Sequence, residues 1–102
     1  MMDDQAAAGS GEGPARVITA TIANQRGLHA RAAAKFVQVS ARFEAEITVS
    51  RGGQTVSGSS IMGLMMLAAG PGCDIEISAA GPDAPAALAA LGKLIEAKFD
   101  EE

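Results

Sequence analysis

The sequence of 102 residues is long enough for one small domain with a modest core, and its formal net charge is −4. The negative charge and the absence of Trp and Tyr argue against a general nucleic-acid surface, which needs a basic patch and stacking aromatic side chains. The single cysteine, Cys73, excludes an intramolecular disulfide and a cysteine metal cluster. Because no signal peptide and no membrane-length apolar run is visible, we expect a cytoplasmic protein without membrane insertion.

Residues 1–14 lack the large apolar side chains that offset the entropy cost of ordering a chain. We therefore expect a disordered N-terminal extension at residues 1–14 and one domain at residues 15–102. The first predicted element of the domain is a half-buried strand at residues 16–22, where β-branched side chains partly alternate with others.

His29 is the only histidine, and it stands where a polar loop is predicted to turn into a helix. The helix is expected at or just after His29, because strong helix formers follow and their apolar members recur at helical spacing. A side chain at this point lies beside backbone N–H groups that have no intrahelical partner, and beside the positive end of the helix dipole. The sequence therefore predicts an anion site at the start of this helix.

The residues around His29 suit the capture of a phosphoryl group by an imidazole. The helix dipole disfavours the imidazolium and so favours the neutral, nucleophilic ring. The amides of Ala30 and Arg31, together with the Arg31 guanidinium, would receive the phosphate oxygens. Gly27 allows a backbone conformation that exposes the ring, and Leu28 is expected to pack beneath it. Spacing alone leaves an alternative open, because a histidine at a helix start is more often a cap or a surface residue.

Two short strands are predicted at residues 44–50 and 54–57. The sequence Arg-Gly-Gly at residues 51–53 joins them as a hairpin turn, because glycine accepts positive φ. Alternating apolar positions in both strands are expected to face the covered side of the sheet. We interpret Arg51 as a solvated turn residue and not as a phosphate ligand.

A short helix is predicted at residues 58–67, with Ser59 and Ser60 as candidate N-caps. Apolar side chains surround this helix, and a domain this small cannot bury them all. We expect Leu64 and Leu67 to fill the core, and some of the other apolar side chains to stay exposed. Those other side chains are Ile61, Met62, Met65 and Met66. Flexible methionines suit a surface that must fit several partners, although a methionine-rich core is the alternative.

An alternating strand is predicted at residues 73–79, where Cys73 is expected to be a small packed residue without thiol reactivity. The last helix is predicted to open with Asp83 as its cap and to carry an apolar stripe that reaches Phe99. The element order is therefore βαββαβα. This order predicts an α+β protein in which three helices cover one face of a four-stranded antiparallel sheet.

Two motifs, Gly-Leu-His-Ala-Arg at residues 27–31 and Ser-Ile-Met-Gly-Leu-Met at residues 60–65, occur in a recognisable order and separation. Together they resemble the phosphocarrier protein HPr family of the bacterial phosphoenolpyruvate-dependent phosphotransferase system. The resemblance extends from about residue 16 to residue 99 and implies the open-faced β-sandwich of that family. One departure is Ala32, where the family usually has proline. Because alanine also suits a helix, this change affects local rigidity and not the chemistry.

The resemblance implies that His29 takes a phosphoryl group on a ring nitrogen from Enzyme I, which phosphoenolpyruvate has charged, and passes it to an Enzyme II A domain. Arg31 would stabilise the phosphate. Ser60 matches a serine that is a regulatory phosphorylation site in some bacteria, where HPr kinase/phosphorylase would be a further partner. A phosphate there would add about two negative charges to an apolar docking surface and block docking.

The resemblance further implies a monomeric phosphoryl carrier that is not itself an enzyme and needs neither cofactor nor metal. Its docking face would include Ile61, Met62 and Met65 beside the active-site helix. Two alternatives remain open at this point. One is an HPr-like carrier that serves a nitrogen or metabolic regulatory branch, and the other is an adaptor that binds through the methionine-rich helix without carrying phosphate.

Overall fold

The computed structural model describes residues 15–101, so the predicted N-terminal extension lies outside the described residues. The elements follow the predicted order βαββαβα, with one short 3-10 helix added at the end. In chain order they are β2 (Arg16–Thr21), α1 (Ala30–Ser40), β3 (Glu46–Arg51), β4 (Gln54–Ser57), α2 (Ile61–Met66), β5 (Asp74–Ala80), α3 (Ala84–Glu96) and η2 (Lys98–Asp100).

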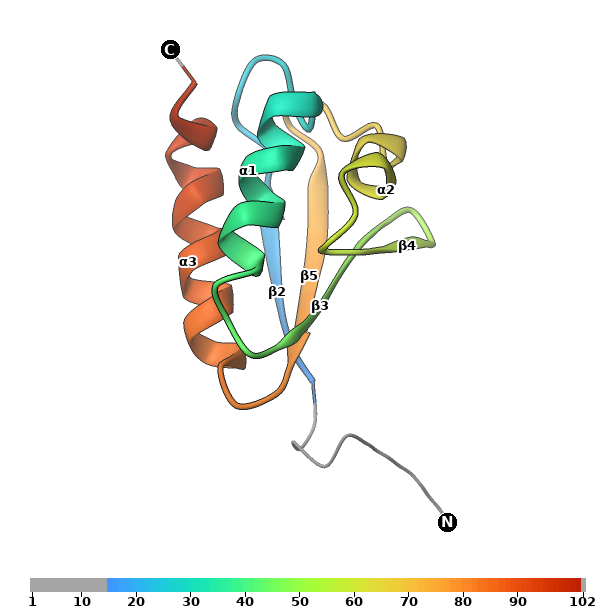
Figure 1. Ribbon diagram of the computed structural model, residues 1–102. Helices are drawn as coiled ribbons and strands as arrows, with labels where there is room; N and C mark the ends of the chain where they lie inside the picture. The colour runs from blue at the N-terminus through green and yellow to red at the C-terminus, as the bar shows by residue number, and fades with distance from the viewer. Residues whose placement is uncertain (1–14, 102) are drawn as a thin grey trace.

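The four strands form one antiparallel sheet in the order β2-β5-β3-β4. In Figure 1 the helices α1 and α3 lie side by side against one face of this sheet, and α2 lies beside α1 near β4. The α+β architecture with an open sheet face is therefore confirmed. Because α1 and α2 pack together, the loop before α1 and the start of α2 belong to the same layer of the molecule.

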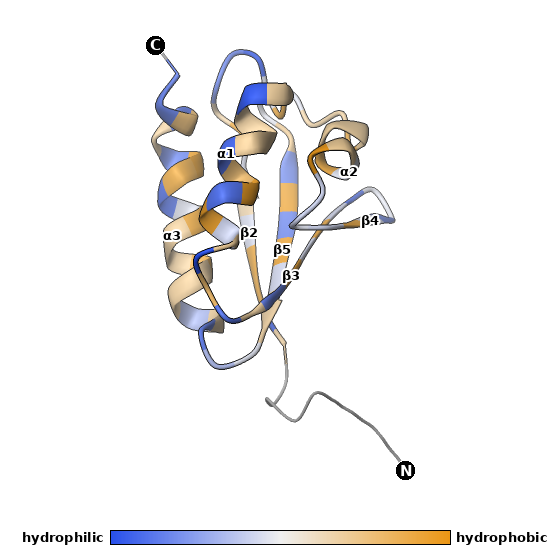
Figure 2. Cartoon of the chain, in the orientation of Figure 1, coloured by the Kyte–Doolittle hydropathy of each residue, from blue (hydrophilic) through white to orange (hydrophobic). Residues whose placement is uncertain are grey.

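Alternating hydropathy fixes the register of the sheet. Along β5, the buried Ile75 and Ile77 alternate with the exposed Asp74 and Glu76, and this alternation is visible in Figure 2. Val49 of β3 is buried directly opposite Ile77. A shift of one residue would turn these side chains to solvent, so the buried face holds the strands in register. Phe36 of α1 and Leu91 of α3 cover this face and are themselves fully buried.

The predicted last helix is shorter than expected. It ends at Glu96, and Phe99 lies in η2 with a left-handed φ of 55°. Phe99 is nevertheless buried, because the turn folds its ring back onto the core. Asp83 does occupy the N-cap position of α3, but its side chain does not cap the helix. Its Oδ2 instead accepts a hydrogen bond of 2.8 Å from the backbone N–H of Glu44, which ties α3 to the loop before β3.

The interpretation of Arg51 as a solvated turn residue was wrong. Its guanidinium is partly buried and donates from Nη1 to the carbonyl oxygen of Leu67 at 2.9 Å, and from Nη2 to the Sγ of Cys73 at 3.3 Å. The side chain therefore joins the β3–β4 hairpin to the end of α2 and to the start of β5. Cys73 packs against the core and is only partly exposed, as a small packed residue should be.

Replacing Arg51 is therefore expected to destabilise the fold. Arg51→Ala leaves the Leu67 carbonyl without this donor, and we expect the free energy of unfolding to fall by about 1–3 kcal/mol. Urea denaturation followed by circular dichroism measures this loss. Arg42→Ala is the matched control, because Arg42 is exposed just after α1 and should change stability by less than about 0.5 kcal/mol. Equal losses in the two variants would contradict the bridging role.

Candidate functional site

His29 is the N-cap residue of α1, as the sequence predicts for a helix that begins just after it. Its backbone is extended, with φ −75° and ψ 179°, and its carbonyl oxygen accepts the N–H of Ala33 at 2.8 Å. The imidazole makes no capping hydrogen bond. Its side chain is 23% exposed, so the ring is reachable from solvent although it is partly enclosed. The side chain of His29 is therefore not used as a helix cap.

The loop before α1 holds the backbone of His29 in a fixed place. Gly27 has a φ of +66°, and a Cβ at this position would collide with the carbonyl oxygen of Ala69. That same carbonyl accepts the N–H of Leu28 at 2.9 Å, and Leu28 is buried. The buried Asn24 donates from Nδ2 to the Gly27 carbonyl at 2.8 Å. The predicted roles of Gly27 and Leu28 fit this geometry, because only glycine allows the loop to approach so closely.

The start of α1 presents an anion-binding arrangement beside the ring. Ala30 and Arg31 occupy the first two helical positions, where backbone N–H groups have no intrahelical acceptor. The positive end of the helix dipole lies at the same point. Both residues are exposed. The structure thus brings His29 together with the two amides that the sequence predicts as phosphate donors.

A pocket of ≈ 340 Å³ lies beside His29 and gathers basic side chains from the loop and from α1. Its lining comes from the loop, from α1 and from the last described residues of the chain. These residues are Gln25, Arg26, His29, Arg31, Ala32, Lys35, Phe99, Asp100 and Glu101. Three basic residues against two acidic ones leave a net positive charge that favours an anion, and one of the basic residues is the predicted Arg31. The other two, Arg26 and Lys35, were not identified from the sequence.

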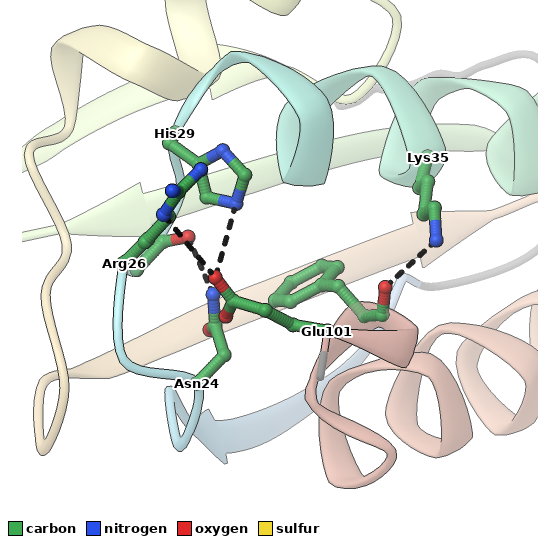
Figure 3. A network of polar contacts seen from close by, with 7 residues as sticks. Asn24, Arg26, His29, Lys35 and Glu101 are labelled. Atoms are coloured by element: carbon green, nitrogen blue, oxygen red, sulfur yellow. Dashed lines mark hydrogen bonds and ion pairs between the residues drawn. The ribbon is translucent and has the colours of Figure 1, made fainter.

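Glu101 is the acidic partner of His29. Its Oε2 lies 3.7 Å from Nε2 of His29 and 3.8 Å from Nε of Arg26, as Figure 3 shows. Lys35 holds the neighbouring turn, because its Nζ donates to the Phe99 carbonyl at 2.9 Å and lies 3.8 Å from Asp100 Oδ2. No local pattern in the sequence connects these positions, since the turn comes from the far end of the chain.

Ser60 is the N-cap of α2, as predicted. Its Oγ accepts the N–H of Gly63 at 2.9 Å, and the residue is half-buried. Ser59, the other candidate, is exposed, and its hydroxyl contacts that of Ser57 at 2.8 Å. Ser60 does not line the His29 pocket, so the two predicted modification sites are on separate elements.

Four large apolar side chains of α2 are exposed and form a surface that we name the α2 patch. They are Ile61, Met62, Met65 and Met66, with exposed fractions of 40%, 69%, 39% and 64%. Leu64 and Leu67 are buried, as predicted. The methionines of α2 are therefore not core residues, and the alternative of a methionine-rich core is wrong for this helix.

The described residues, 15–101, contain no group of three or more His, Cys, Asp or Glu side chains that could hold a metal ion. Over the same part of the chain, none of the helices combines the length and the apolar character needed to cross a membrane.

Comparison with known proteins gives a consistent result. The family model of the PTS HPr component phosphorylation site matches residues 17–97. Phosphocarrier protein NPr of Shewanella violacea is 48% identical over 81 residues, which cover 79% of this chain and 89% of that protein. Phosphocarrier protein HPr of Treponema pallidum is 44% identical over 86 residues, which cover 84% and 98%. The crystal structure of HPr from Thermoanaerobacter tengcongensis superimposes with a TM-score of 0.81 at 44% identity, covering 85% of this chain and 98% of that one.

Gly27→Ala tests how strictly the loop conformation is imposed. A side chain at this position meets two penalties, the left-handed backbone and the collision with Ala69. Gly52→Ala is the matched control, because Gly52 has a φ of +57° but open space around it. We expect Gly52→Ala to cost about 1 kcal/mol of unfolding free energy and Gly27→Ala about 1–3 kcal/mol more. Denaturation curves of the two variants check the difference, and identical midpoints would show that the loop can move away from Ala69.

Proposed function

This chain belongs to the HPr family of phosphocarrier proteins of the phosphotransferase system, and we propose that His29 accepts a phosphoryl group from phospho-Enzyme I and passes it to an Enzyme II A domain. The observation that carries the proposal is the place of the imidazole. The ring is partly exposed at the N-terminus of α1, in a pocket whose lining includes three basic side chains.

The proposed step exchanges one bond to phosphorus for another. A lone pair on a ring nitrogen of His29 attacks phosphorus, the bond from phosphorus to the donor breaks, and its electron pair returns to the donor. The amides of Ala30 and Arg31 and the Arg31 guanidinium would hold the oxygens of the transferred group through charge-assisted hydrogen bonds. Because the two amides are fixed by the start of α1, little reorganisation of these donors would be needed during transfer.

We propose Nδ1 as the accepting atom. Nε2 lies 3.7 Å from the Glu101 carboxylate, and an incoming phosphoryl oxygen on that side would meet a charge of the same sign. Nδ1 is the other ring nitrogen, and it points away from this carboxylate. The proposed site therefore uses opposite sides of one ring for the carboxylate and for the phosphate.

The α2 patch supports a docking role in this transfer. Its exposed apolar side chains include the predicted docking residues Ile61, Met62 and Met65, and α2 packs directly against α1. Methionine side chains adapt to surfaces of different shape, which suits a carrier that must meet a donor and an acceptor in turn. We propose that both partners bind across this patch and the start of α1.

Ser60 is proposed as a regulatory phosphorylation site, for which HPr kinase/phosphorylase would be the modifying partner. A phosphate at the N-terminus of α2 is compatible with the helix dipole, so the domain itself would remain folded. Its charge would stand beside Ile61 and Met62 of the α2 patch. The proposed effect is therefore on docking and not on the fold.

A carrier that serves a nitrogen or metabolic regulatory branch is the second candidate. The relative named NPr, 48% identical, is about as similar to this chain as the relatives named HPr. The residues around His29 do not separate the two candidates, because both require the same phosphoryl transfer. The identity of the acceptor protein would distinguish them.

Labelling tests the proposed chemistry. Incubation of the chain with Enzyme I and phosphoenolpyruvate carrying labelled phosphate is expected to give one acid-labile label per chain, because phosphohistidine hydrolyses in acid. His29→Ala should remove the label completely, since His29 is the only histidine of the sequence. An unlabelled wild-type chain would refute the carrier function and favour the adaptor that binds through the α2 patch.

A charge at Ser60 tests the docking proposal. Ser60→Asp keeps a good N-cap but places a negative charge beside the α2 patch, whereas Ser60→Asn keeps the cap without the charge. We expect the KM of Enzyme I for the carrier to rise by roughly tenfold in Ser60→Asp and by less than about twofold in Ser60→Asn. The kcat should be nearly unchanged in both variants. The rate of labelling at varied carrier concentration gives both constants. Equal KM values in the two variants would contradict docking beside Ser60.

A further inference from the structure

We infer that Glu101 is a positioning residue for His29, whose carboxylate holds the ring hydrogen on Nε2 and so turns the lone pair of Nδ1 toward the phosphoryl group. The inference rests on the proposed transfer to His29 and adds a residue from the far end of the chain to that site. It starts from the contact between Glu101 Oε2 and His29 Nε2 at 3.7 Å.

A carboxylate next to one ring nitrogen decides which nitrogen carries the hydrogen in neutral histidine. An N–H on Nε2 faces the negative Oε2, whereas a lone pair there would be repelled by it. The same carboxylate favours the positive charge that develops on the ring as Nδ1 attacks phosphorus. At 3.7 Å the two atoms lie beyond hydrogen-bond distance, and catalytic contacts are often this long before substrate arrives.

Of the two acidic residues that line the pocket, Glu101 is the one whose carboxylate lies next to the imidazole. Arg26, Arg31 and Lys35 line the same pocket and bring positive charge to it. Asp100 is exposed, and its carboxylate lies by the amino group of Lys35. Oε2 of Glu101 lies 3.8 Å from Nε of Arg26 and 3.7 Å from Nε2 of His29, so the carboxylate faces both a guanidinium and the ring.

The backbone directly before Glu101 is strained. Lys98, Phe99 and Asp100 have φ values of 58°, 55° and 58°, a left-handed conformation that residues other than glycine rarely adopt in succession. Two contacts impose it, the burial of the Phe99 ring and the hydrogen bond from Lys35 Nζ to the Phe99 carbonyl. Strained residues that are held by their surroundings gather at functional sites.

The second oxygen of the carboxylate gives an independent observation. Oε1 of Glu101 is buried and has no hydrogen-bond partner among the described residues. Burying part of a carboxylate in this way is unfavourable, and an ion pair that served stability alone would gain from leaving both oxygens in water. The position of Glu101 is better explained by its effect on the ring than by its effect on the fold.

Three variants of the full chain separate this role from a structural one. Glu101→Gln removes the charge and keeps the size, Glu101→Asp keeps the charge, and Glu96→Gln removes an exposed carboxylate from α3 as a matched control. Two quantities are measured. Nitrogen-15 NMR of the imidazole, at a pH where the ring is neutral, gives the nitrogen that carries the hydrogen. Rapid-quench labelling by Enzyme I and phosphoenolpyruvate gives kcat and KM.

We expect the hydrogen on Nε2 in the wild-type chain and a mixture of both tautomers in Glu101→Gln. The kcat for phosphoryl acceptance should fall about tenfold in Glu101→Gln, with KM changed by less than about twofold. Glu101→Asp should recover most of the loss, and Glu96→Gln should match the wild type.

Several outcomes would overturn the inference. They are a wild-type ring with its hydrogen on Nδ1, an unchanged tautomer in Glu101→Gln, or an unchanged kcat in that variant. Each leaves the proposed function intact as long as the wild-type chain is labelled and His29→Ala is not. An unlabelled wild-type chain is a different result, because it removes the transfer on which the inference rests.

Discussion

The close approach of the Gly27 backbone to the Ala69 carbonyl is the constraint on which the site depends. The first residue belongs to the loop that ends in His29, and the second follows α2, so one contact ties the loop of the proposed nucleophile to the segment that follows the α2 patch. Leu28 uses the same carbonyl as an acceptor, and its side chain is buried in the core. The reactive corner and the contact surface are thus parts of one rigid arrangement, although separate stretches of chain supply them.

The proposed site combines two kinds of surface, a polar pocket and an apolar patch. The pocket at His29 is polar and lined by three basic and two acidic side chains, whereas the α2 patch is apolar and exposed. A carrier that binds a small molecule would need an enclosing pocket, but a carrier that meets another protein needs a contact area and an accessible atom. The geometry of this chain fits the second requirement, and its partner would complete the enclosure.

Features set by neighbours in the sequence were predictable, and features set by distant residues were not. The start of α1 after His29, the cap at Ser60 and the exposed methionines of α2 all follow from local spacing and from the small size of the core. The roles of Arg51 and Glu101 depend on side chains that cross from one element to another. No periodicity records such contacts, because the partners meet only after the sheet and the helices have packed together.

The hydroxyl that caps α2 is the atom that a protein kinase would have to reach. In the folded chain that oxygen is occupied by the Gly63 amide at 2.9 Å, and the residue is half-buried. A kinase that modified Ser60 would have to compete with this hydrogen bond for the hydroxyl oxygen, so opening of the first turn of α2 would favour the modification. The stability of that first turn would then affect the rate of the proposed modification.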